Sequence, residues 1–338
     1  MYFHDSADTA GNIEKGIRIF KMKIKTWRYD DMQELRQALR IRYVKLHFKV
    51  QFWKASRLPV NKVSAIRGGI GEMLLRANCI RDRNCTSCDF EQECIVRRTM
   101  YSKFDRKPAF VTTGDSAGYV LECENYEEFF DAGDTLEFHL ILFGRTIVYF
   151  SQFLQAVYQL GNAGIGKEHA MYHLVSVRNT TGKEILDGNR ILMEHYEIQT
   201  IDDYVRYRLQ GNGRWENQIR FKTPVTLKYQ GKIQETLTLE AVAAAVFRRL
   251  YILDCFEGLD CGELCWQGEY PKVLEENSKR ITVCRYSGTQ DQKMALRGIK
   301  GDMQLSGLPQ ELLQVLLAGE IMHIGKNTSF GFGRYHVR

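Results

Sequence analysis

Alternating apolar and polar residues indicate strands along the first half of this chain, and longer periodic segments between them indicate helices. Residues 43–50 alternate with a period of two, which predicts a strand with one buried face. Residues 62–77 carry the apolar spacing of a helix. Further strands are predicted at 109–121, 135–143 and 170–177, and a further helix at 147–160. The predicted order is strand, helix, strand, strand, helix, strand.

The second half of the chain repeats this order of elements, although no residue-by-residue repeat is visible. Strands are predicted at 218–229, 281–286 and 293–305, and a helix at 237–256. In a last helix Pro309 suits the first turn, and Gly319 suits a left-handed cap at the end. One face of that helix carries Leu312, Leu313, Leu316 and Leu317. A final strand is predicted to end with residues 330–335.

This pattern predicts an α+β protein made of two tandem ferredoxin-like (RRM-like, βαββαβ) domains with a small zinc-knuckle-like insert. We place the N-terminal domain at residues 15–178, with the insert at 79–94. The C-terminal domain is placed at residues 216–338, with a glycine-rich loop at 325–334. Residues 179–215 are interpreted as a linker or loop, because polar residues replace the apolar periodicity where this segment begins.

The composition is that of an ordinary globular protein. The chain has 338 residues, of which 44% are hydrophobic and 26% charged, and these values exclude disorder and collagen-like structure. No run of 18 apolar residues and no signal peptide is visible. We therefore expect a cytoplasmic protein with no membrane partner.

Charge is distributed unevenly along the chain. The formal net charge is +6, yet residues 15–49 alone hold 11 basic and 3 acidic side chains. Trp27, Tyr43 and Phe48 are interleaved with these cations, as in proteins that stack on bases while neutralising phosphates. The alternative is a solvated helix face together with core aromatic residues. The pattern permits an RNA or DNA partner.

Four of the nine cysteines form the cluster Cys79-x5-Cys85-x2-Cys88-x5-Cys94. The central Cys-x2-Cys places two thiolates on one side of a tight turn, and the outer cysteines lie close enough to complete a tetrahedron. This spacing predicts a structural zinc ion, with buried cysteines or an iron–sulfur cluster as alternatives. The cysteines within residues 255–265 have weaker spacing and are interpreted as ordinary buried or loop cysteines.

Two glycine-rich segments invite comparison with phosphate-binding loops. Residues 161–167 match most of a Walker A pattern, but Glu168 stands where Ser or Thr must hold magnesium, and a helix precedes the loop. A glycine-permitted turn is the better interpretation. Residues 323–334 combine three glycines with Lys326 and Arg334, a combination that favours a polyanionic backbone as ligand.

The segment from Gly319 to Tyr335, which contains this second glycine-rich stretch, resembles the glycine-rich loop of the RAMP superfamily of CRISPR-associated proteins. Within that superfamily the chain is similar to the Cas-six endoribonucleases, which process precursor CRISPR RNA. The run Ile66-Arg67-Gly68-Gly69-Ile70-Gly71 followed by four cysteines resembles one branch of them. Weaker marks lie at residues 142–144, 161–167, 223–224, 248–250 and 285–287, so the resemblance covers about residues 44–338.

This resemblance implies a metal-independent endoribonuclease with CRISPR repeat RNA or crRNA as its partner, beside other CRISPR effector subunits. Attack of a 2′-hydroxyl on the adjacent phosphate would leave a 2′,3′-cyclic phosphate and a 5′-hydroxyl. That reaction needs a base, an acid and cations around the phosphate, and no catalytic metal.

The catalytic residues are harder to assign, because residues 51–110 contain no histidine where many family members carry one. His323 is the first candidate, since it precedes the glycine-rich loop beside Lys326, and His47 is the second. Either histidine has a purely structural alternative, and His169 and His173 rank lower. The expected RNA-binding residues are Lys54, Arg57, Lys62, Arg67, Gly325, Lys326, Ser329, Gly331, Gly333 and Arg334.

Two other functions stay open at this stage. A non-catalytic RAMP subunit that binds crRNA in an effector complex would also lack the histidine after the first strand. A zinc-stabilised nucleic-acid-binding module outside the family is the third interpretation.

Overall fold

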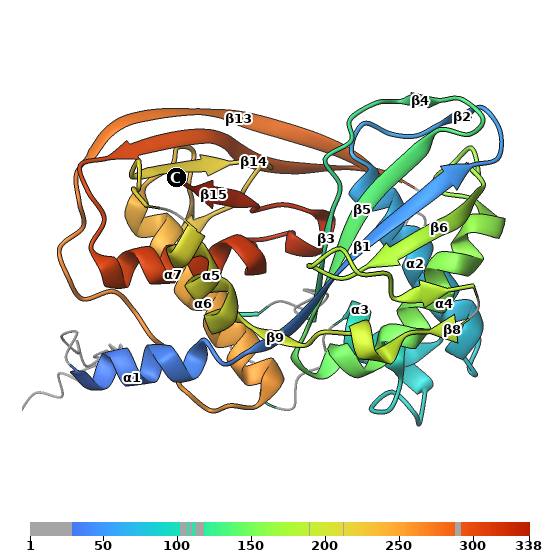
Figure 1. The fold of residues 1–338 in the computed structure, drawn as a ribbon, viewed down its shortest axis with the longest axis horizontal. Helices are drawn as coiled ribbons and strands as arrows, with labels where there is room; N and C mark the ends of the chain where they lie inside the picture. The colour runs from blue at the N-terminus through green and yellow to red at the C-terminus, as the bar shows by residue number, and fades with distance from the viewer. Residues whose placement is uncertain are drawn as a thin grey trace, which may run out of the picture.

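Two α+β domains lie side by side, each with its own antiparallel sheet (Figure 1). This computed structural model describes residues 29–101, 106, 108, 110–111, 118–188, 190–211, 213–287 and 292–338. The basic stretch before residue 29 and much of the predicted strand 109–121 therefore lie outside the described residues.

The N-terminal domain has the predicted order of elements. They are β1 (Arg42–Phe52), α2 (Lys62–Asn78), β3 (Tyr119–Glu122), β5 (Thr135–Phe143), α4 (Phe150–Ala163) and β6 (Tyr172–Arg178). The sheet has the order β3-β5-β1-β6 with antiparallel neighbours, and the short β9 (Gln199–Thr200) also pairs with β1. The two central strands, β1 and β5, are those that precede the helices α2 and α4 in sequence, which is the ferredoxin-like arrangement.

Strand β1 shows why the period-two pattern predicted this sheet. Leu46, Phe48 and Val50 are fully buried in the core that the sheet shares with α2 and α4. Lys45 and His47 point to the opposite face and stay partly exposed. The alternation therefore divides β1 into a core face and a polar face.

The C-terminal domain repeats the arrangement, as predicted. Its elements are β10 (Gln218–Phe221), α6 (Leu239–Glu257), β13 (Val273–Ser287), β14 (Gln292–Leu305), α7 (Gln310–Met322) and β15 (Tyr335–Val337). The sheet order is β13-β14-β10-β15, again with antiparallel neighbours.

The hairpin of β13 and β14 is much longer than the sheet to which it belongs. Its pairing runs from Val273 opposite Leu305 to Ser287 opposite Gln292, whereas β10 covers only residues 302–304 of β14. The free part of the hairpin arches over the molecule and contacts α2 of the other domain (Figure 1). The sequence predicted nearly all of β14, but only residues 281–286 of β13.

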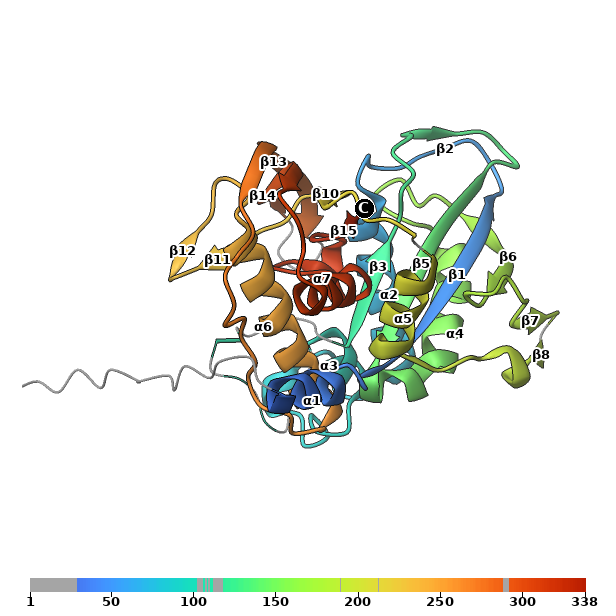
Figure 2. The same ribbon diagram turned by 60° about the vertical axis from the view of Figure 1, so that its left-hand side comes forward.

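Shorter elements connect the two domains and decorate them. Helix α1 lies at the bottom of both views, in contact with α6 (Figures 1 and 2). Helix α1 spans Tyr29–Ala38. The other short elements are α3 (Ile95–Met100), α5 (Ile201–Gly211), β2 (Ser56–Arg57), β4 (Phe129–Phe130), β7 (Leu186–Asp187), β8 (Arg190–Ile191), β11 (Lys228–Tyr229), β12 (Lys232–Ile233) and the 3-10 helix η4 (Thr328–Phe330). No described helix is long and apolar enough to cross a membrane.

Three predicted boundaries are wrong. The strand predicted at 218–229 ends at Phe221, because Pro224 interrupts it and residues 228–229 pair in a separate hairpin. Residues 179–215, predicted as a linker, contain three short strands and α5. The final strand begins at Tyr335, where the prediction ended it, because residues 328–333 form η4 and a turn.

Gly319 does not cap α7, which continues to Met322 and ends at His323 with a φ of 55°. A Cβ atom on Gly319 would lie 2.1 Å from the hydroxyl oxygen of Tyr335 and 2.8 Å from Cγ2 of Val246. Tyr335 cannot easily move, since it is buried and its hydroxyl donates to the carbonyl oxygen of Leu316. Glycine is needed here for close packing and not for a left-handed turn.

The two hydrophobic cores meet at the strands β3 and β5. Val120, Ile141 and Phe143 belong to the core of the C-terminal domain, while their neighbours Leu121 and Leu142 belong to that of the N-terminal domain. Residues 119–121 of β3 and 140–143 of β5 are apolar on both faces because a domain covers each face there. The domains are therefore held in fixed relation by a continuous apolar contact.

We expect Gly319→Ala to destabilise the protein by about 1–3 kcal/mol, because the new methyl group overpacks the site against Tyr335. Gly68→Ala is the matched control, since Gly68 also lies in a helix but has nothing within 4 Å of its Cβ position. It should stabilise by up to about 1 kcal/mol. Urea unfolding measures both, and equal effects of the two changes would contradict the close-packing role.

Candidate nucleic-acid interface

A cleft of about 1140 Å³ lies between the two domains. One wall comes from the start of α2 and from the loop that follows β3, and the other comes from β10 and the β13–β14 hairpin. The glycine-rich segment lies where the walls meet, through Phe330, Gly331 and Phe332. The cleft is therefore bounded by both ferredoxin-like units.

Glu122, at the end of β3, ties the two domains together beneath this cleft. Its carboxylate is buried and accepts from Lys45 Nζ at 2.8 Å and from His323 Nε2 at 3.0 Å, and lies 3.3 Å from Arg334 Nε. Burial opposes ionisation, but Lys45, His323 and Arg334 outweigh it and hold the pKa of Glu122 well below its ordinary value. The carboxylate is therefore charged at neutral pH and binds cationic and polar groups of both domains.

His323 is wholly buried, with both ring nitrogens directed at protein atoms. Nε2 donates to Glu122, and Nδ1 lies 3.2 Å from the carbonyl oxygen of Phe332. Burial lowers the pKa of His323, whereas the hydrogen bond to Glu122 and the charge of that carboxylate act in the opposite direction. This placement favours the structural alternative, in which His323 orders the glycine-rich segment.

The glycine-rich segment is folded tightly against its own domain. Gly333 has a φ of 76°, and a Cβ atom there would lie 1.8 Å from the carbonyl oxygen of Ile324. The amide of Gly333 donates to the carbonyl of Pro224, and the amide of Lys326 donates to the carbonyl of Thr226. The Lys326 side chain is exposed, whereas Ser329 is buried. The segment thus has a fixed backbone with Lys326 as its projecting cation.

Several basic residues expected to bind RNA are engaged with the protein itself. Lys62 is 1% exposed and donates to the carbonyl oxygens of Asn125, at 3.1 Å, and of Glu127. Burial lowers its pKa, and its ammonium group is used to hold the loop after β3. Lys62 is therefore unavailable to a ligand in this structure, which corrects the expectation from its position.

Arg334, Arg57 and Lys54 differ in how accessible they are. Arg334 pairs with Glu122 and Glu124, so it belongs largely to the contact between the domains. Arg57 lies 3.4 Å from Glu128 and over the Phe129 ring, and Lys54 is exposed. Arg67 lies beside Phe330 in the glycine-rich segment.

His47 lies on the polar face of the N-terminal sheet, outside the lining of the cleft. Its ring stacks on that of His139 at 4.8 Å, and its Nε2 lies 3.0 Å from Glu137. Burial lowers the pKa of His139 to about 4. His169 and His173 also lie away from the cleft, and the ring of His169 contacts the carbonyl oxygen of Ala163.

Three residues at the cleft were not predicted from the sequence: Glu122, Tyr126 in the loop that follows β3, and Lys300 on the hairpin. Glu122 opens the acidic run of residues 122–137, and its one distinguishing signal is that it directly follows three apolar strand residues. Lys300 on β14 lines the cleft opposite Tyr126, 5.9 Å from its ring centre. Burial raises the pKa of Tyr126, so its hydroxyl remains protonated at neutral pH.

The four clustered cysteines line one pocket of about 280 Å³. Within the described part of the chain, however, no three His, Cys, Asp or Glu side chains come together as a metal-binding set. The thiolates in this arrangement do not fit a zinc ion without moving. Structural zinc therefore stays a prediction, which metal analysis of the purified protein can check.

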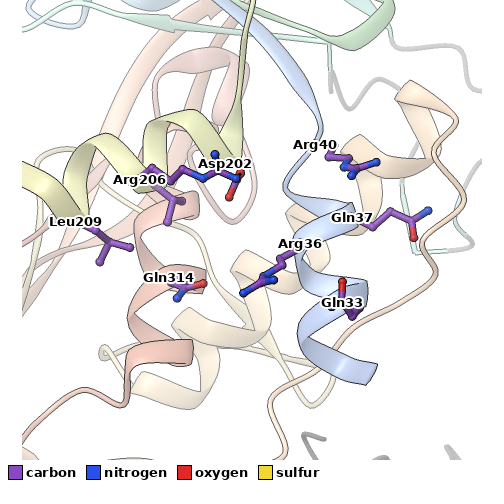
Figure 3. A pocket seen from close by; sticks show the side chains of 9 residues that line it. Gln33, Arg36, Gln37, Arg40, Asp202, Arg206, Leu209 and Gln314 are labelled. Atoms are coloured by element: carbon purple, nitrogen blue, oxygen red, sulfur yellow. Dashed lines mark ion pairs between the residues drawn. The ribbon is translucent and has the colours of Figure 1, made fainter. Parts of the chain in front are cut away.

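A second polar pocket, of about 650 Å³, lies between α1, α5 and α7 (Figure 3). Arg36 of α1 and Gln314 of α7 face the same space, and Arg206 pairs with Asp202 on α5. None of its lining residues lines the cleft between the domains. No sequence motif marks this pocket, since its lining comes from three helices that are distant in the chain.

Comparison with family models yields two matches, one for each domain. A model described as an N-terminal domain matches residues 39–201. The model of the CRISPR-associated endoribonuclease Cas6 matches residues 219–335, from β10 to β15. The search against curated proteins produced no significant match.

Among solved structures, a partial Cas6-RT-Cas1–Cas2 complex matches with a TM-score of 0.53, at 13% identity, over 88% of this chain and 46% of that chain. A Cas6-RT-Cas1–Cas2 complex matches with the same score and identity over 88% and 29%. Thermus thermophilus Cas6 has a TM-score of 0.45, at 12% identity, over 88% and 99%. The chain spans less than half the length of the first two proteins. The chain therefore shares its fold with the first two of these structures, and its C-terminal domain matches the Cas6 endoribonuclease model.

We expect Glu122→Gln to destabilise the protein by about 3–5 kcal/mol at pH 7, because it leaves the partly buried Lys45 and Arg334 without their shared counter-charge. Glu124→Gln is the control, since Glu124 also pairs with Arg334 but is exposed, and it should cost at most about 1 kcal/mol. Urea unfolding of both variants measures this difference. Equal losses would show that the buried carboxylate has no special role.

The same pair of variants also tests the pH dependence. The folded-state pKa of Glu122 is depressed, so its contribution is fully present above the ordinary glutamate pKa of about 4.3. It is lost as the pH falls through the depressed value. The difference in the free energy of unfolding between the wild type and Glu122→Gln should therefore decrease only at acidic pH, below the ordinary glutamate pKa.

Proposed function

We propose that this protein is an endoribonuclease that binds CRISPR repeat RNA in the cleft between its domains and cleaves precursor crRNA. The observation that supports this most is the glycine-rich segment at the meeting of the two cleft walls, within the range matched by the Cas6 family model. The cleft is also lined by both domains, and its volume of about 1140 Å³ exceeds that of a typical small-molecule pocket.

The chemistry we propose is attack of a 2′-hydroxyl oxygen on the adjacent phosphorus. A bond forms between that oxygen and phosphorus while the bond from phosphorus to the 5′-oxygen breaks. A base takes the 2′-hydroxyl proton, and an acid gives a proton to the leaving 5′-oxygen. The products are a 2′,3′-cyclic phosphate and a 5′-hydroxyl. Cations stabilise the charge that develops on the phosphorane, with no catalytic metal in the proposal.

Residue roles follow from accessibility. Lys326 is exposed on the glycine-rich segment and is our first candidate for stabilising the phosphorane. His47 is the candidate for proton transfer, provided that the RNA extends past Glu122 onto the polar face of β1. His323 is proposed to position the segment, since its ring is enclosed. Lys300 and Tyr126 add a cation and a hydroxyl on facing walls of the cleft.

We propose CRISPR RNA and other CRISPR proteins as the partners. Two structures of similar fold are complexes that join Cas6 to a reverse transcriptase, Cas1 and Cas2, which suggests that this chain also operates within an assembly.

A non-catalytic crRNA-binding subunit is the second candidate function. One observation favours it: of the described histidines, only His323 lines the cleft, and its side chain is buried. An RNA strand in the cleft would then meet cations but no accessible imidazole.

We expect the purified protein to cut labelled CRISPR repeat RNA from its own genome once per repeat in the presence of EDTA. The product should carry a 2′,3′-cyclic phosphate, and a 2′-deoxy substitution at the scissile nucleotide should abolish cleavage because it removes the nucleophile. A denaturing gel resolves the products, with an unrelated RNA as control. Tight binding without cleavage would favour the non-catalytic subunit.

We expect Lys300→Ala to weaken repeat-RNA binding and to reduce the slope of log affinity against log salt by about 1, because one phosphate contact is lost. Lys232→Ala on the exposed β12 is the control and should leave both unchanged. Fluorescence anisotropy across a salt series measures the slopes. Identical slopes for the two variants would place the RNA outside this cleft.

A further inference from the structure

Two arginines from different domains converge on one aromatic ring. The guanidinium carbons of Arg67, on α2, and Arg285, on β13, each lie 4.4 Å from the centre of the Phe330 ring. Phe330 belongs to the glycine-rich segment and lines the cleft. This cluster is the point at which the long hairpin, the glycine-rich segment and the first domain meet.

The two arginines lack a counter-charge within the described part of the chain. Neither guanidinium forms an ion pair with a described residue, and the buried Nε atom of each has no hydrogen-bond partner there. Among the described residues, the Arg285 side chain makes one polar contact, from its NH2 group to the sulfur of Met294 at 3.1 Å. Burial, followed by the charge of Arg67, lowers the pKa of Arg285. Elsewhere this chain pairs its partly buried arginines, as it does Arg208 with Glu320.

Such an arrangement is unfavourable unless an anion completes it. Contact with the face of Phe330 attracts each guanidinium weakly, but it satisfies none of their N–H donors. Two like charges around one ring also repel each other in a site where water is partly excluded. Guanidinium groups bind phosphate oxygens through paired N–H donors, and their orientation here is fixed by the ring.

We propose that Arg67 and Arg285 together bind one phosphate of the RNA backbone, which latches the tip of the β13–β14 hairpin onto α2. This inference depends on the proposed RNA-binding function and specifies a contact within it. The phosphate neutralises both arginines, which lie beside the cleft-lining Phe330, and joins an element of each domain, so bound RNA holds the hairpin against α2.

The test combines a double-mutant cycle with a measurement that needs no RNA. Arg67→Gln and Arg285→Gln should each lower affinity for repeat RNA about tenfold, as expected for loss of a charge-assisted hydrogen bond. The double variant should lose little more than either single variant, because both arginines hold the same phosphate. If the fold-loss of affinity in the double variant equals the product of the two single losses, the arginines do not share a phosphate and the proposal is overturned.

Matched controls come from the same two elements. Arg76→Gln on α2 and Arg280→Gln on β13 remove exposed arginines that pair with Glu72 and Glu235, and both should retain RNA affinity. If these controls lose as much RNA affinity as Arg67→Gln and Arg285→Gln, then charge on these elements acts without a specific site, which would overturn the proposal.

Thermal unfolding of the free protein separates an anion site from a purely structural stack. Inorganic phosphate should raise the Tm of the wild type and have a smaller effect on Arg285→Gln, while without phosphate the variant should be as stable as the wild type or more so. A lower Tm for Arg285→Gln in phosphate-free buffer, with no change in its phosphate response, would make the cluster structural only. Because this measurement uses neither repeat RNA nor cleavage, its outcome is independent of whether the protein is a nuclease.

Discussion

The buried carboxylate of Glu122 is the interaction on which the geometry of the cleft depends. It lies at the end of β3 and binds Lys45 in its own domain and His323 and Arg334 in the other. Removing ions from water costs much of what their attraction returns, so such a cluster contributes more to geometry than to net stability. His323 lies just before the glycine-rich segment and Arg334 lies at its end. By binding both residues, Glu122 holds this segment against the N-terminal sheet.

The apolar contact between the domains and this ion cluster act together. Val120 and Ile141 bury the faces of β3 and β5 against the C-terminal core, and Glu122 is the one charged residue on β3. Apolar surfaces alone tolerate small shifts, whereas a carboxylate with three directional partners allows one alignment. The walls of the cleft are therefore held in register by a contact at its base.

Apolar periodicity predicted the order of the elements and both sheets, because each strand or helix has one apolar and one polar face, and this alternation is visible in the local sequence. It was wrong where distant packing decides the outcome. Gly319 has the sequence context of a cap, but Tyr335 requires a glycine inside the helix. Lys62 looks like a surface cation, yet its partners are backbone carbonyls more than 60 residues away. A backbone carbonyl is present at every residue, so the sequence does not show which of them binds a lysine. The sequence alone therefore could not show which cations near the cleft are accessible to a ligand.

The position of β15 in the chain has a consequence for synthesis on the ribosome. This strand pairs with β10 at the edge of the C-terminal sheet, and it follows the glycine-rich segment directly. The N-terminal sheet can form while later residues are still inside the exit tunnel, but one wall of the cleft and its base await Tyr335–Val337. Until the C-terminal domain has folded, Glu122 of a nascent chain therefore has Lys45 as a partner but neither His323 nor Arg334, and the base of the cleft is completed only then.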